Sequence, residues 1–64
     1  MQVKVVTISA AHEEDVTLVF DATHSNDEIR AYIDLNVLDE VYEGLTIADC
    51  DVLINTQTVL RFTV

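Results

Sequence analysis

Hydrophobic and polar residues alternate along two stretches near the start of the chain. Residues 2–9 (QVKVVTIS) are rich in β-branched side chains, and residues 15–22 (DVTLVFDA) place four alternating apolar side chains on one face. An alternation of period two is typical of strands with one buried face. Because only the polar loop 10–14 separates the two stretches, the pattern predicts a β-hairpin.

Two further apolar runs lie near the other end of the sequence, DVLI at 51–54 and VLRFTV at 59–64. Four polar residues, NTQT at 55–58, separate them. One long strand would suit the shared parity of the apolar positions, whereas a hairpin would place the polar residues in its turn. The polar residues favour the hairpin, so one or two C-terminal strands are expected.

The segment between these strands, SNDEIRAYIDLNVLDEVYEG at 25–44, carries the start and stop signals of a helix. Ser25, with Glu28 three residues later, forms a capping-box pattern. Asp27 and Glu28 would lie in the first turn, where the helix dipole favours negative charge. Gly44, the only glycine, suits the position just past a helix end. These signals predict helical structure at about 26–43.

The apolar positions of this segment do not fit one regular helix. At about 100° per residue, one set of side chains shares one face and a second set shares another, offset by more than about a quarter turn. The first set is Ile29, Tyr32 and Ile33, and the second is Val37, Leu38, Val41, Tyr42 and Leu45. We therefore predict two short helices, at about 26–34 and 37–43, with a break near 34–36. Asn36 with Asp39 repeats the capping-box pattern in weaker form and would start the second helix.

Two other interpretations of the segment remain open. Residues 29–37 also alternate apolar and polar side chains without interruption, which is typical of a strand. That interpretation replaces the first helix with a strand of a β-meander, followed by a short helix at 37–44. A single continuous helix would instead expose its second apolar set as an interface for a partner.

Together these elements predict an α+β fold in a single compact domain, residues 1–64. The sheet is small and antiparallel or mixed, built from the N-terminal hairpin and one or two C-terminal strands. The helical segment covers one of its faces. A chain of 64 residues forms only a marginal core, and the half of its residues that are hydrophobic supply that core.

Negative charge dominates the chain, with a formal net charge of −9 from twelve acidic and three basic residues. All the acids lie between Glu13 and Asp51, and Arg30 is the only Lys or Arg in that span. Nucleic acids and anionic membranes repel such a protein, so neither is expected to bind it directly. No apolar run approaches the roughly 18 residues of a membrane span. The expected partners are proteins with basic surfaces.

The residue types that carry catalysis or bind metals are sparse. His12, His24 and Cys50 are poor material for a zinc site, and the acidic stretches lack the pattern of a calcium loop. One glycine cannot form a Gly-rich phosphate loop, and a small domain leaves little room for a substrate pocket. We therefore expect no metal, no cofactor and no enzyme activity. A single cysteine excludes an internal disulfide and is compatible with the reducing cytoplasm, which is the expected location.

The carboxylates supply the leading functional hypothesis. Spread over a small rigid body, they would imitate a row of phosphates and occupy the basic site of a nucleic-acid-handling protein, as an inhibitor or regulator. Tiny acidic inhibitors are typical of phages and mobile elements, which suggests such a source by analogy. The candidate acidic face comprises Glu13, Glu14, Asp15, Asp27, Glu28, Asp34, Asp39, Glu40 and Glu43.

An alternative hypothesis gives the acids no binding role. A non-catalytic structural or assembly subunit would join a larger complex or a homo-oligomer through edge strands and an apolar stripe of Val37, Leu38, Val41 and Tyr42. The carboxylates would then serve only to keep the protein soluble. Salt separates the two hypotheses, because screening weakens acidic recognition and leaves apolar assembly nearly unchanged.

Overall fold

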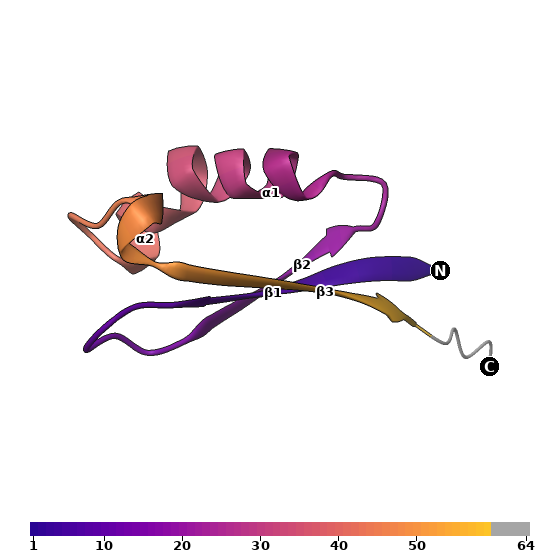
Figure 1. Cartoon of the computed structure of the whole chain (residues 1–64), viewed down its shortest axis with the longest axis horizontal. Helices are drawn as coiled ribbons and strands as arrows, with labels where there is room; N and C mark the ends of the chain where they lie inside the picture. Colours follow the sequence, from indigo (N-terminus) through magenta and orange to yellow (C-terminus); the bar gives the residue numbers. More distant parts are fainter. Residues whose placement is uncertain (60–64) are drawn as a thin grey trace.

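The computed structural model describes residues 1–59 and shows a three-stranded sheet with a helix on one face (Figure 1). The strands are β1 (Gln2–Ser9), β2 (Val16–Asp21) and β3 (Asp51–Thr58), in the spatial order β2-β1-β3. Both outer strands are antiparallel to β1. The predicted α+β fold with an N-terminal hairpin and a C-terminal strand is confirmed. The β-meander alternative is wrong, because residues 29–37 are helical.

The pairing of β1 with β2 was predicted correctly, whereas β3 is longer than the sequence predicted. β1 and β2 form the predicted hairpin, with Ile8 opposite Val16 next to the connecting loop. β3 pairs with β1 over all eight of its residues, so the predicted turn at 55–58 is wrong. The polar side chains of that stretch are exposed on an edge strand, where polar side chains stay in water without ending the strand. Residues 60–64, which include most of the predicted last strand, lie outside the described residues.

The helical layer runs without interruption from Asn26 to Val41. It consists of α1 (Asn26–Tyr32), a π-helical turn η1 (Ile33–Val37) and α2 (Leu38–Val41). In the π turn the Leu38 N–H donates to the carbonyl of Ile33, five residues back. The break predicted near 34–36 is therefore a local widening of the helix and not an interruption.

The π turn resolves the conflict between the two apolar sets. Ile29, Ile33, Leu38 and Tyr42 are all buried, at intervals of four, five and four residues. A regular α-helix would separate Ile33 from Leu38 by about 140° around its axis. The wider turn takes up one extra residue, so the buried members of both sets face the sheet on the same side of one helix.

The polar signals along the helix have different outcomes. Ser25 caps its start as predicted, since the Ser25 Oγ accepts a hydrogen bond from the Glu28 N–H at 3.1 Å. The second capping box is wrong: the Asn36 side chain lies inside the π turn and donates to the Tyr32 carbonyl at 3.3 Å. Gly44 follows the helix with a φ of 85°, a left-handed conformation that glycine adopts without strain.

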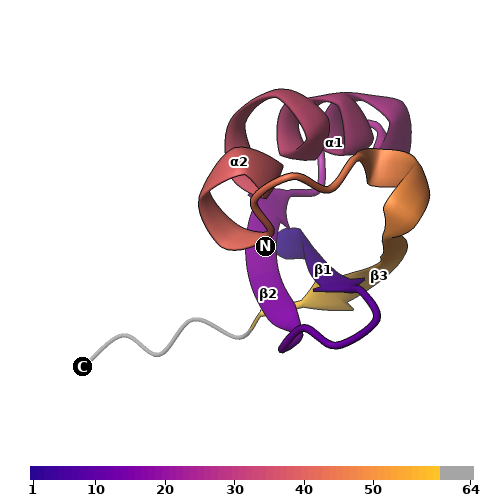
Figure 2. The same ribbon diagram turned by 90° about the vertical axis from the view of Figure 1, so that its left-hand side faces the viewer.

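The core lies between the sheet and the helix, as the end-on view in Figure 2 shows. Val6 and Ile8 of the central strand meet the four buried helix residues, and all six side chains are at most 2% exposed. Tyr42 also ties this layer to the hairpin loop: its hydroxyl lies 2.9 Å from the Ile8 carbonyl oxygen and also contacts that of Glu14. The end of the helix and the hairpin loop are therefore held in one rigid arrangement.

Candidate protein-binding surface

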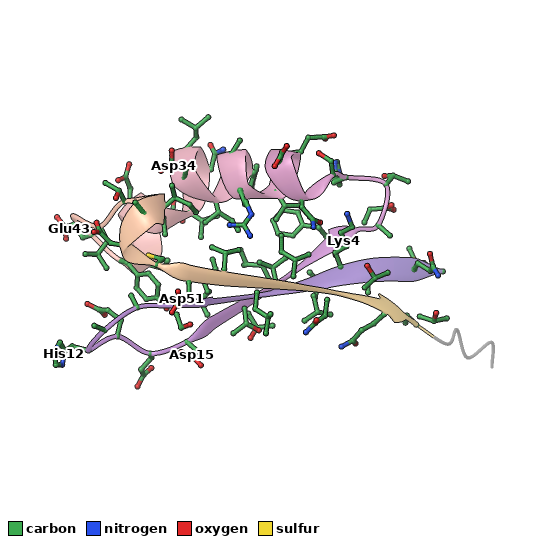
Figure 3. All side chains as sticks on the ribbon, in the orientation of Figure 1. Lys4, His12, Asp15, Asp34, Glu43 and Asp51 are labelled. Atoms are coloured by element: carbon green, nitrogen blue, oxygen red, sulfur yellow. The ribbon has the colours of Figure 1, made fainter. Side chains whose placement is uncertain are left out.

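The fold gathers most of the acidic residues at one end of the molecule. The hairpin loop after β1, the end of α2, the short 3-10 helix η2 (Ile47–Asp49) and the start of β3 all meet there (Figure 1). Figure 3 shows Asp15, Glu43 and Asp51 at this end, with Lys4 towards the other. We call this surface the acidic end; its carboxylates are Glu13, Glu14, Asp15, Asp39, Glu40, Glu43, Asp49 and Asp51.

The carboxylates of the acidic end are exposed and not neutralised by cations in the described part of the chain. All eight are exposed. Within residues 1–59 the one contact between a carboxylate and a basic side chain joins His24 Nδ1 to Glu28 Oε2 at 3.3 Å; it is an ion pair only when His24 is protonated, and it lies elsewhere. Lys4 is engaged by the His24 carbonyl and the Asn26 side chain, at 2.7 and 3.0 Å. The negative charge of the acidic end is therefore available to an outside partner.

Two titratable groups at the acidic end, the Tyr42 hydroxyl and the Asp49 carboxyl group, have shifted pKa values. Burial raises the pKa of the Tyr42 hydroxyl, and the nearby Asp15, Cys50 and Glu13 raise it further. These residues lie near Tyr42 because the hairpin loop contacts its hydroxyl and Cys50, just before β3, packs against the same core. The pKa of Asp49 is lowered because its carboxylate accepts hydrogen bonds from the Thr46 N–H at 2.9 Å and the Thr46 hydroxyl at 3.0 Å. Asp49 thus serves as a cap for η2, unlike its neighbours.

The structure divides the acidic face that the sequence suggested. Six of its nine residues lie at the acidic end, those of the hairpin loop and of the last part of the helix. Asp27 and Glu28 lie in the first turn of α1, at the opposite end. Asp34 is exposed on η1, on the outer side of the helix and towards the acidic end (Figure 3). Sequence reasoning missed Asp49 and Asp51 as members. Their position at or just before the start of a predicted strand was the available signal, because the start of that strand meets the hairpin loop when it pairs antiparallel with β1.

Glu28 caps the start of α1, and this role accounts for its lowered pKa. Its side chain accepts a hydrogen bond from the Ser25 N–H at 3.4 Å and contacts His24. Its pKa is lowered first by the hydrogen bond with His24 and then by those with Ser25. The carboxylate therefore completes the capping box and stabilises the start of α1.

We expect the substitution Glu28→Gln to destabilise the protein at pH 7 and to lose this effect in acid. Glutamine keeps the capping hydrogen bond but removes the charge. Because the folded-state pKa of Glu28 is lowered, its charge stabilises the fold above its ordinary pKa of about 4.3, and this contribution disappears as the pH falls through the lowered value. Urea unfolding at neutral and acidic pH measures the difference. The control is Glu40→Gln, which makes the same change in net charge; equal effects of both variants would contradict the prediction.

The apolar stripe expected on the surface belongs instead to the interior. Leu38 and Tyr42 are 1% and 2% exposed, and Val37 and Val41 are half-buried against the same core. These side chains face the sheet, so the stripe does not form an outer face of the helix. The large apolar side chains that are exposed include Val19, Tyr32, Leu35 and Leu53.

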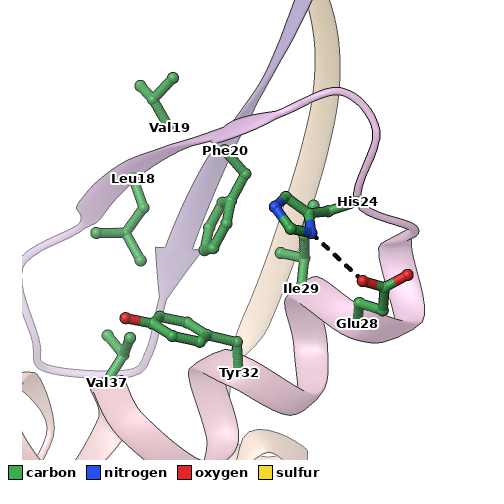
Figure 4. Close-up of a pocket in the computed structure, with 8 residues that line it drawn as sticks. All are labelled: Leu18, Val19, Phe20, His24, Glu28, Ile29, Tyr32 and Val37. Carbon is green, nitrogen blue, oxygen red and sulfur yellow. Dashed lines mark hydrogen bonds and ion pairs between the residues drawn. The ribbon is translucent and has the colours of Figure 1, made fainter.

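A pocket of about 560 Å³ opens between β2 and α1 (Figure 4). Phe20 and Tyr32 meet edge-to-face in it, with ring centroids 5.7 Å apart and an angle of 81° between the rings. His24 and Glu28 form its polar part. The remaining lining is apolar and consists of Leu18, Val19, Ile29 and Val37. The expectation that so small a domain leaves little room for a pocket is therefore wrong, because the width of this pocket depends on the distance between the helix and the strand.

The described part of the chain lacks the features of a metal site, a reactive thiol or a membrane-spanning helix. Residues 1–59 contain no group of three or more His, Cys, Asp or Glu side chains placed to hold a metal ion. Burial raises the pKa of the Cys50 thiol, and the flanking Asp49 and Asp51 raise it further, so the reactive thiolate is disfavoured. None of the helices in this range has the length and apolar character needed to cross a membrane.

Comparison with known proteins does not assign the chain to a family. No family model matches the chain, and no curated protein or solved structure is significantly similar to it. The class that the fold and surface define is a small α+β domain with its carboxylates concentrated at one end.

Proposed function

We propose that this protein is a non-catalytic binding module that inhibits or regulates a nucleic-acid-handling protein by placing its acidic end in that protein's basic site. The observation that carries the proposal is the concentration of eight exposed carboxylates at one narrow end of a molecule measuring 43 × 22 × 16 Å. A site that attracts phosphates through Lys and Arg attracts such carboxylates by the same Coulomb forces. The lone thiol of Cys50 suits work in the reducing cytoplasm.

The architecture supports recognition by a preorganised surface. The hairpin loop carries Glu13, Glu14 and Asp15, and Tyr42 holds that loop against the end of the helix. A rigid set of charges loses less conformational entropy on binding than a disordered acidic tail does. The acidic end is therefore suited to a defined basic groove and not merely to keeping the protein in solution.

The test is a capture experiment with charge-matched variants. The immobilised protein is exposed at low salt to a lysate of its source cell or host, and bound proteins are eluted first with duplex DNA and then with high salt. We expect DNA to displace a basic, nucleic-acid-binding protein, and we expect binding of that protein to weaken steeply with salt. If neither DNA nor salt releases such a protein, the proposal is wrong.

The acidic end itself is tested with the double variant Asp15→Asn/Glu43→Gln. Removal of two surface contacts, each worth up to about 1 kcal/mol, should weaken binding of the captured partner by about tenfold. The control, Asp21→Asn/Asp27→Asn, makes the same change in net charge at the other end of the molecule and should bind like the wild type. Equal losses in both variants would show that net charge, and not this surface, governs binding.

A further inference from the structure

The outer edge of β2 presents unpaired backbone groups. The Ala22 N–H donates to the Gln2 carbonyl at 3.3 Å, which makes Ala22 opposite Gln2 a hydrogen-bonded pair of the β1–β2 ladder. Such pairs recur at every second residue, so Leu18 and Phe20 also direct their N–H and C=O groups towards β1. Thr17 and Val19 therefore direct theirs away from the sheet, where no described segment pairs with them.

This edge lacks the devices that usually protect an edge strand. Residues 16–20 (VTLVF) contain no charge and no proline, although the chain as a whole carries a net charge of −9; the one charged residue of β2 is Asp21, at the end of the strand. The register with β1 runs from 16 to 21 without a bulge. Val19 at the middle of the edge is 64% exposed. An uncharged, regular and partly apolar edge is a template for pairing with another strand.

The pocket beside the edge supplies room for side chains of an added strand. Side chains on the helix-facing side of β2, those of Leu18 and Phe20, line the pocket together with Ile29 and Tyr32 of α1 (Figure 4). A strand hydrogen-bonded to Thr17 and Val19 would continue the sheet and point its alternate side chains into the same space. A binder must therefore be extended and apolar at alternate positions. These are the properties of residues 16–20 themselves.

We infer that two copies of this chain pair through their β2 edges, antiparallel about a two-fold axis at Val19, with Phe20 of each copy entering the pocket of the other. In this register Val19 faces Val19 of the second copy, and Leu18 faces Phe20 of the second copy. Because β1 places Val5 beside Val19, the pairing also forms one continuous apolar row of four valines on the open face of the joined sheet.

Charge disfavours one of the two neighbouring registers. Pairing centred on Val19 places Asp21 opposite Thr17 of the second copy and Asp15 opposite Thr23, so no two acids face each other. A shift that places Thr17 opposite Val19 would bring Asp15 opposite Asp21 twice, and like charges directly opposite are destabilising. The antiparallel arrangement also sends the two acidic ends to opposite ends of the dimer, which limits the repulsion between two chains of the same charge.

The dimer and the proposed function respond to salt in opposite directions. Salt screens the repulsion between two negatively charged copies, so we expect dimerisation to strengthen as salt rises. Binding of a basic partner by the acidic end weakens under the same change. The edge of β2 contributes none of the carboxylates of the acidic end. The dimer can therefore be disproved while the proposed binding of a basic partner still holds, and the reverse.

Analytical ultracentrifugation over a range of concentration and salt tests the inference. We expect a concentration-dependent dimer, whose dissociation constant rises by at least about tenfold in Val19→Lys, where two lysines face each other. Leu53→Lys is the matched control: Leu53 is 59% exposed on β3, and the variant has the same net charge and should dimerise like the wild type. A monomer at every concentration and salt, or equal effects of both variants, would overturn the inference.

A second measurement uses the wild-type protein alone. In concentrated solution the Thr17 and Val19 amide protons should exchange more slowly with solvent than they do in dilute solution, since the second copy accepts their hydrogen bonds. Amide exchange at those two positions that does not change with concentration would overturn the inference even if the Val19→Lys variant failed to fold.

Discussion

The substitution Ile33→Ala should lower the free energy of unfolding by about 3 kcal/mol, enough to leave a domain of this size largely unfolded on mild heating. Ile33 is fully buried and begins the π turn, where it packs with Ile29 and Leu38 against β1. Its removal costs the transfer free energy of the lost methyl and methylene groups and leaves a cavity beside the widened turn. Urea unfolding followed by circular dichroism measures the change.

The control for this prediction lies two residues further along the same turn. Leu35 is 74% exposed, so Leu35→Ala removes a large apolar side chain without opening a cavity. We expect that variant to unfold within about 0.5 kcal/mol of the wild type. If both variants lose the same stability, the π turn does not orient the helix as described, and the two apolar sets do not share one buried face.

The second large effect is expected from Tyr42→Phe. The ring remains, but the hydroxyl that reaches the Ile8 and Glu14 carbonyls is lost. A buried acceptor left without its donor is costly, and in a domain of this size we expect the thermal midpoint to fall by about 5–10 °C. Amide exchange should also accelerate in residues 10–15, because the hydroxyl is what ties the hairpin loop to the end of the helix.

Tyr32→Phe is the matched variant, since Tyr32 is the other tyrosine of the chain and is 51% exposed. Its thermal midpoint should change by less than about 2 °C. The comparison also bears on the proposed function, because a loosened hairpin loop would disperse three carboxylates of the acidic end. If Tyr42→Phe unfolds like the wild type and binds a basic partner equally well, the loop is held by other contacts and preorganisation is not what Tyr42 provides.

The local features of this protein follow from its sequence alone. The alternation in residues 2–9 and 15–22, the short loop between them and the capping box at Ser25 each depend on near neighbours in the chain. Hydrogen bonds and side-chain periodicity over a few residues decide them, so they could be predicted without knowing what packs against them. Helical structure at about 26–43 was predicted for the same reason, but as two short helices, whereas the structure has one continuous helix at 26–41.

The remaining features were decided by contacts between distant segments. The offset between the two apolar sets indicated an irregularity near 34–36, but only packing of Ile33 and Leu38 against the sheet decided that the helix widens there and does not break. Packing against β1 places Tyr42 in the core. Pairing with β1 extends β3 through the polar residues 55–58. The order and direction of the strands and helix likewise decided whether the acidic residues form one surface. The acidic end exists because the hairpin loop, the end of the helix and the start of β3 meet at one end of the sheet, a juxtaposition that only the tertiary structure determines.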